Sequence, residues 1–265
     1  MTITANATTA TPEVTTVPRR TPMSPMRKAA LIAGVAYIAT FVTSIPVKFG
    51  FWSDVLAKPD FVLGRGTSVG VPIGAVLEIL TALGGVVSAV ALYTVAKRYS
   101  QRAALGFVTT RLLEAAMILV GVLSILTVYA LRTDVAGSPG TDPDTLVTTG
   151  RAFVAMHDWT FLIGPGLMPA LNALLIGSVM YRSRLLPRWI PTLGLIGAPL
   201  LIISSTATLF GGWGQVSAPS AIMTLPIAIW EFSFGVYMLV KGFRPTDVSE
   251  ETFAPVNSTI FEIAA

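Results

Sequence analysis

The sequence predicts an all-α membrane protein, a six-span transmembrane helical bundle with both termini in the cytoplasm. Its composition is 53% hydrophobic and only 12% charged, whereas soluble domains carry roughly 25% charged residues. The apolar residues gather in six stretches, each long enough to cross the hydrocarbon core of a bilayer as a helix. The basic residues gather in alternate connections between these stretches, as expected when positive charge opposes translocation.

The six predicted spans differ in their ends and in their polar content. The fourth is expected to start as a helix at Asp142-Pro143, which has the form of an N-cap followed by proline, and to enter the bilayer near Asp158. The first is expected to be peripheral, because it has the weakest stripe of small and polar residues. The spans are predicted at residues 29–47, 71–95, 104–130, about 158–181, 190–210 and 219–240.

Two polar tails flank the predicted membrane domain, which covers residues 27–243. Residues 1–26 are rich in Thr, Pro and Ala without an apolar period, which is typical of a disordered segment. No short apolar core precedes a cleavage site there, so a cleavable signal peptide is not expected. Residues 244–265 are polar and acidic and form the predicted C-terminal tail.

The orientation follows from the positions of the eighteen Lys and Arg residues. Twelve lie in the two tails and in the basic turns around 97–102 and 182–188, five lie in the opposite connections, and Arg111 lies inside a span. The positive-inside rule therefore predicts that both basic turns and both termini are cytoplasmic. The positive charge is thus explained by orientation, and no nucleic-acid partner is expected.

Several functional classes are disfavoured by residues that are missing from the sequence. There is no cysteine and His157 is the single histidine, so thiol chemistry and multi-histidine metal sites are excluded. No phosphate-binding loop, dinucleotide fingerprint or His/Glu metal spacing occurs, and no nucleophile–base pair is visible. We therefore expect no metal and no cofactor, and the sequence leans against an enzyme. The expected partners are the lipid bilayer and an unidentified small ligand or protein.

The chemistry that remains is a group of ionisable residues inside the spans. Arg111 and Glu114 are three residues apart and so share one helix face, at a depth where a charge costs roughly 2.5–3.5 kcal/mol or more. Glu231 and Glu78, on other spans, are candidate partners, with Glu231 favoured by its depth. One arginine cannot pair fully with three carboxylates, so an unpaired acid is expected to be neutral.

This polar centre has three interpretations. The ion pair and the acids can simply hold the helices together, or they can line a polar cavity or proton path. Alternatively, Arg111 reaches the cytoplasmic interface by extending its side chain.

A second candidate region lies on the fourth span. His157-Asp158-Trp159 can be an interfacial turn with an aromatic anchor, or a pH-sensing or ligand-binding outer mouth. Gly164-Pro165-Gly166 predicts a break in this helix between about residues 162 and 169. Such a break can serve helix packing alone, or it can produce a broken helix that lines a site. Asn172 is expected to form a hydrogen bond between helices.

Taken as a set, several segments resemble a bacterial integral-membrane family, domain of unknown function 4386. The resemblance covers residues 27–243 and implies a multi-span protein of the bacterial cytoplasmic (inner) membrane with no assigned activity. The segments are Arg-Lys-Ala-Ala-Leu-Ile-Ala-Gly from residue 27, Arg111-x-x-Glu114, His157-Asp158-Trp159, Tyr181-Arg-Ser-Arg-Leu-Leu-Pro-Arg-Trp189, Leu193-Gly-Leu-Ile-Gly197, Trp230-Glu231 and Val240-Lys-Gly-Phe243.

Two functional hypotheses follow from these residues. The first is a binding or transport-like module built around Arg111, Glu114, Glu231 and Glu78. The second is a structural or regulatory membrane subunit whose buried charges only hold the helices together. A continuous polar cavity that reaches one membrane face would favour the first hypothesis, and a dry core with a closed ion pair would favour the second.

Overall fold

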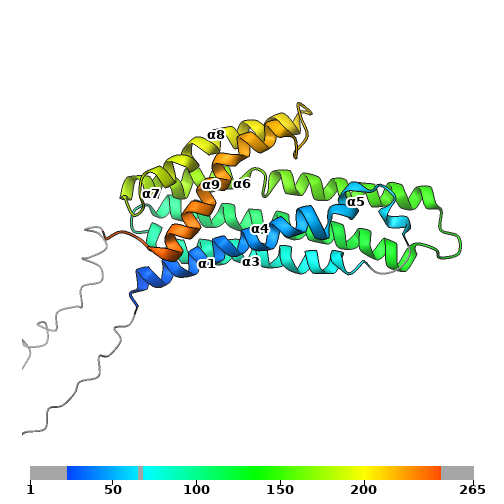
Figure 1. Ribbon diagram of the computed structural model, residues 1–265, viewed down its shortest axis with the longest axis horizontal. Coiled ribbons are helices and arrows are strands. Elements are labelled where there is room, and N and C mark those ends of the chain that lie inside the picture. The colour runs from blue at the N-terminus through cyan, green and yellow to red at the C-terminus, as the bar shows by residue number, and fades with distance from the viewer. Residues whose placement is uncertain (1–22, 65–67, 246–265) are drawn as a thin grey trace, which may run out of the picture.

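The computed structural model describes residues 23–64 and 68–245, which form a bundle of long helices (Figure 1). Six helical segments in this part of the chain are long and apolar enough to cross a membrane, so the chain is a multi-pass membrane protein, as predicted. The tails predicted at 1–26 and 244–265 lie almost wholly outside the described residues. The α-helices are α1 (Pro25–Pro46), α2 (Ser53–Ala57), α3 (Gly70–Ala96), α4 (Gln101–Ala130), α5 (Pro143–Ile163), α6 (Met168–Asn172), α7 (Ser178–Ser183), α8 (Trp189–Leu209) and α9 (Ala218–Val240).

Three spans contain a wider π-helical segment that joins or extends α-helices. These segments are Val47–Phe51, Leu131–Val135 and Ala173–Gly177, and a short 3-10 turn lies at Phe61–Leu63. The first lengthens α1 by five residues beyond Pro46, so this span reaches Phe51 rather than the expected end near residue 47.

Side-chain caps mark the starts of several helices. The predicted cap of α5 is confirmed, because Asp142 Oδ2 accepts hydrogen bonds from Thr145 Oγ1 at 2.6 Å and Thr145 N at 2.9 Å, with Pro143 at the first helical position. These two hydrogen bonds hold the pKa of Asp142 below its usual value. Ser24 and Ser100 accept similar bonds at the starts of α1 and α4.

The expectation that the first span is peripheral is wrong. α1 packs against both α3 and α9, and a Cβ atom on Gly34 would lie 2.6 Å from Leu239 N and 2.9 Å from Gly235 O. This contact between the backbones of α1 and α9 depends on small side chains, including the buried Ala30 and Ala33. The polar stripe of a helix is therefore a poor guide to its burial, because alanine and glycine suffice for close packing.

One end of the bundle holds the described N-terminus, the described C-terminus and both basic turns. Figure 1 shows the start of α1 beside the end of α9. Arg27 donates from Nη1 to Met238 O at 3.0 Å and from Nη2 to Leu239 O at 2.9 Å, which satisfies carbonyls at the end of α9. Arg244 N donates to Leu185 O, which ties the chain after α9 to the turn between α7 and α8. We call this end of the bundle the basic end.

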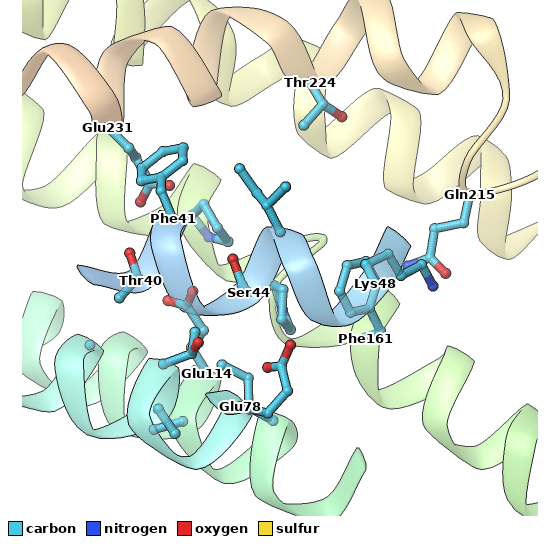
Figure 2. Close-up of a pocket in the computed structure, with 18 of the residues that line it drawn as sticks. Thr40, Phe41, Ser44, Lys48, Glu78, Glu114, Phe161, Gln215, Thr224 and Glu231 are labelled. Carbon is cyan, nitrogen blue, oxygen red and sulfur yellow. The ribbon is translucent and has the colours of Figure 1, made fainter. Parts of the chain in front are cut away.

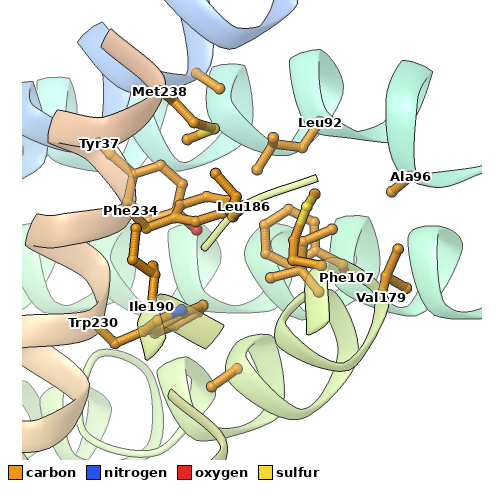
Figure 3. Packing of buried hydrophobic residues seen from close by; sticks show 14 of the residues in the cluster. Tyr37, Leu92, Ala96, Phe107, Val179, Leu186, Ile190, Trp230, Phe234 and Met238 are labelled. Atoms are coloured by element: carbon orange, nitrogen blue, oxygen red, sulfur yellow. The ribbon is translucent and has the colours of Figure 1, made fainter. Parts of the chain in front are cut away.

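Large side chains fill the half of the bundle nearer the basic end. The ring of Phe234 meets that of Tyr37 in a T-shaped contact and that of Trp230 in a tilted one, and all three residues are fully buried or nearly so. Figure 3 shows them packed with Phe107 and neighbouring residues from the other helices. Trp230 lies directly against α8, because a Cβ atom on Gly194 would be 2.7 Å from its ring. The candidate site lies beside this cluster, on the side away from the basic end.

The orientation can be tested by cysteine labelling, since the chain has no native cysteine. Gln101→Cys and Arg182→Cys place thiols in the two basic turns, at positions that are not buried. We expect neither to react with a membrane-impermeant maleimide added outside intact cells, because both turns should be cytoplasmic. Ser138→Cys, exposed in the connection at the opposite end, is the matched positive control and should react. Labelling of a cysteine at position 101 or 182 from outside would show that the orientation is the opposite of the predicted one.

Candidate functional site

The structure brings together three of the four acidic and basic residues predicted for the polar centre. Arg111 Nη1 donates to Glu114 Oε2 at 3.1 Å and to its Oε1 at 3.3 Å. Arg111 Nη2 donates to Glu231 Oε1 at 2.9 Å, which joins α4 to α9. Only 5% of Arg111 is exposed, so a cation in the apolar interior is neutralised by carboxylates from its own helix and from another span.

A second set of contacts fixes this charged cluster. Asn172 Nδ2 donates to Glu114 Oε2 at 2.8 Å, and Thr110 Oγ1 donates to Asn172 Oδ1 at 2.5 Å. The guanidinium carbon of Arg111 lies 4.8 Å from the centre of the Tyr37 ring, a cation–π contact. Arg111 therefore links α4 to α1 and α9, and Glu114 and Thr110 link α4 to α6.

A break in the fourth membrane segment positions Asn172. α5 ends at Ile163, a turn covers residues 164–167, and α6 begins at Met168. Glycine is required at the break, since a Cβ atom on Gly166 would lie 2.5 Å from Leu162 O. Ser205 Oγ on α8 donates to Gly166 O at 2.7 Å, which satisfies a carbonyl that the helix no longer pairs.

A cavity of about 370 Å³ lies beside the charged cluster. Figure 2 shows Glu114 and Glu231 near one end of the α1 segment that crosses it, and Lys48 and Gln215 near the other. Thr40, Ser44 and Thr224 add hydroxyl groups to the lining. The remaining walls are mostly apolar and include Phe41, Phe49, Phe161, Ile45, Ile118, Pro165, Pro169 and Val216.

The cavity continues away from the basic end. A more open hollow of about 600 Å³ shares Lys48, Phe49, Gln215 and Val216 with it. Asp158 also lines this outer hollow, which we call the mouth. The cavity and the mouth thus adjoin, and the cavity extends to the buried Arg111, whose guanidinium lies against the Tyr37 ring.

Glu78 faces the same cavity without contacting Arg111. Among the described residues, no Lys, Arg or His nitrogen lies within the ion-pairing distance of 4.0 Å from its carboxylate. The Nζ atom of Lys48 lies 4.7 Å from the centre of the Phe161 ring. Glu78 is therefore a cavity residue rather than a third ligand of Arg111.

The placement of His157 at an outer mouth is wrong. His157 lies within α5 and only 5% of it is exposed, because its ring packs between those of Trp52 and Phe161. The segment is continuous helix, so it is not an interfacial turn either. Asp158 does line the mouth, and its Oδ1 lies 3.2 Å from His157 Nδ1.

Sequence reasoning missed several residues of the cavity, above all Lys48 and Tyr37. The position of Lys48 after Pro46 suggests a loop, but the π-helical segment after α1 carries it into the span. A signal is present in the spacing: Thr40, Ser44 and Lys48 recur every four residues and so lie on one face of the helix. Nothing in the sequence marks Tyr37, whose role depends on the approach of α1 to α4.

The described residues contain no group of three His, Asp or Glu side chains that could hold a metal ion. What the site offers chemically is a set of fixed charges and hydroxyl groups beside an apolar space. Such a set suits binding and orientation of a charged small molecule.

Comparison with known proteins gives a family and no further relatives. No curated protein matches the chain, and no solved structure matches it. The model of the family "Domain of unknown function (DUF4386)" matches residues 32–242. This match covers most of the chain and both sides of the charged cluster, including Arg111, Glu114 and Glu231. The chain therefore belongs to the DUF4386 family of integral membrane proteins, the family that its sequence resembles.

Proposed function

We propose that this protein is a binding module of a transport-like kind in the bacterial cytoplasmic membrane, and that it takes up a small ligand from the face opposite the basic turns. The observation that carries the proposal is the cavity that connects the mouth with Arg111, Glu114 and Glu231. Its volume falls within the range of roughly 300–1,000 Å³ that is typical of small-molecule sites. Buried charges that only hold helices together do not require a cavity of this size beside them.

The orientation expected from the basic residues supports entry of the ligand from outside the cell. The basic turns and Arg27 lie at one end of the bundle, and the positive-inside rule assigns that end to the cytoplasm. The mouth lies at the other end, so we place it on the periplasmic side. The aromatic cluster around Tyr37 and Trp230 closes the cytoplasmic half. The arrangement then corresponds to a state that is open to the outside and closed to the inside.

Cysteine accessibility tests this proposal. Ser44→Cys and Thr224→Cys place thiols in the cavity from α1 and α9. We expect both to react with a small, charged, membrane-impermeant thiol reagent added outside intact cells, because the cavity should contain water. Ser88→Cys is the matched control. Ser88 also carries a hydroxyl group and also lies in a span, but the residue is only 1% exposed and does not line the cavity.

The two functional hypotheses predict different results in this experiment. A binding module predicts reaction at positions 44 and 224 and none at 88. If positions 44 and 224 are unreactive while Ser138→Cys is labelled in the same cells, the cavity is dry or closed and the structural-subunit hypothesis is favoured.

A further inference from the structure

We propose that the cavity selects an organic cation with an apolar body, such as a quaternary ammonium ion or a protonated amine. This inference rests on the function proposed above and names the class of ligand for that site. It is carried by three features of the cavity: an excess of carboxylates, the internal pairing of Arg111, and aromatic walls.

The first feature is the balance of fixed charge. Three carboxylates line the cavity, those of Glu78, Glu114 and Glu231, and Asp158 adds a fourth at the mouth. The cationic side chains that line the same space are Arg111 and Lys48. A cleft with an excess of one sign of charge and low-dielectric walls concentrates ions of the opposite sign. A cation that enters the cavity also favours the ionised form of each carboxylate that it approaches, so the cavity favours cations over anions.

The second feature is that Arg111 is not available to an anionic ligand. Both terminal nitrogens of Arg111 already donate to carboxylates, and the Tyr37 ring covers the guanidinium. Lys48 lies at the other end of the cavity, over the Phe161 ring, where the carboxylates of Glu78 and Asp158 also line the space. An anion that bound Arg111 would have to displace Glu114 or Glu231, which would leave a charge unpaired in an apolar environment.

Two carboxylates, by contrast, can accept a cation. The side chain of Glu231 is 16% exposed and makes its contact with Arg111 through Oε1, which leaves Oε2 for a ligand. Glu78 lines the cavity with no cation within 4.0 Å among the described residues. A cation in the cavity can thus approach either carboxylate without breaking an existing ion pair.

The third feature is the apolar and aromatic lining. Phe41, Phe49 and Phe161 contribute rings from α1, its π-helical extension and α5, and Ile45 and Ile118 add aliphatic surface. Ring faces attract quaternary ammonium groups, most strongly where water is excluded. The apolar area also favours a ligand with a hydrocarbon body over a hydrated inorganic ion. Charge and lining together favour an organic cation over both an anion and a simple metal ion.

Calorimetric titration of the full-length protein in detergent micelles can test the inference, with protein-free micelles as the blank. The probe is benzyltrimethylammonium, whose positive charge does not depend on pH. Its neutral carbon analogue, neopentylbenzene, has nearly the same shape, and benzenesulfonate supplies an anion of similar size. We expect the cation to bind at least tenfold more tightly than the neutral analogue and the anion to bind more weakly than either.

Charge-neutralising variants locate the effect in the cavity. Glu231→Gln and Glu78→Gln should each weaken binding of benzyltrimethylammonium about tenfold, because each removes a negative charge next to the ligand. Glu78→Gln is the more secure test of the two, since Glu78 supports no ion pair and its loss should not disturb folding. Asp144→Asn is the matched control, because it removes a negative charge at an exposed position outside the cavity and should leave the affinity unchanged.

Three results would overturn the inference: no binding of the cation, equal or tighter binding of the neutral or anionic probe, or unchanged affinity in Glu78→Gln. Reactive thiols at positions 44 and 224 would then still support a binding module for another class of ligand. If those thiols are also unreactive, the proposed function fails together with the inference. The two failures are therefore distinguishable.

Discussion

Arg111→Leu is expected to lower the free energy of unfolding by roughly 3–5 kcal/mol, more than any other single substitution proposed for this protein. The arginine forms ion pairs with two carboxylates, and its loss leaves both Glu114 and Glu231 in an apolar environment without a cation. The measurement is reversible unfolding in mixed micelles, followed by circular dichroism. Leu112→Ala, on the exposed face of the same helix, is the control and should have a much smaller effect.

The double variant Arg111→Leu/Glu231→Leu should recover much of this loss, because it removes a charge and its partner together. The two single losses should therefore sum to more than the loss in the double variant, with an interaction energy of roughly 0.5–3 kcal/mol. Recovery should stay incomplete, since Glu114 keeps Asn172 as a partner but has no cation. Strict additivity of the two single losses would contradict the interhelix ion pair.

The second large effect is expected at the contact between α1 and α9. Gly34→Ala should destabilise the protein by about 1–3 kcal/mol, because the new Cβ atom would meet backbone atoms of α9, which cannot rotate away. Gly85→Ala is a matched control on α3, where a Cβ atom would have no neighbour within 4 Å. It should be neutral or stabilise the helix by up to about 1 kcal/mol. Equal effects of the two substitutions in the same unfolding assay would refute the close approach of α1 and α9.

The architecture was largely predictable from the sequence, for a physical reason. A bilayer demands apolar helices of a minimum length, so six long apolar stretches suffice to predict six spans. The break in the fourth segment was predictable in the same way, because glycine and proline act through the local backbone and need no knowledge of neighbouring helices.

The arrangement of the charged cluster was only partly predictable. The ion pair between Arg111 and Glu231 could be predicted because charges inside a membrane need partners and these two residues lie at similar depths. Asn172 was expected to form a hydrogen bond between helices, as it does. Its partners and the contribution of Tyr37 could not be predicted, since they depend on which helices are neighbours and how far each is rotated. The placement of His157 was wrong for a related reason: its environment is set by aromatic rings that pack against it, and hydropathy along one helix does not reveal packing against another.

The central claim is that the buried charges serve binding as well as folding, and one measurement tests it most directly: the affinity of the folded Arg111→Leu/Glu231→Leu variant for benzyltrimethylammonium. We predict that this variant folds but binds the cation at least tenfold more weakly than the unmodified protein. The loss follows because Glu231, whose Oε2 is left for the ligand in the unmodified protein, is gone. A folded double variant that binds the cation with unchanged affinity would show that the charged cluster only holds the helices together.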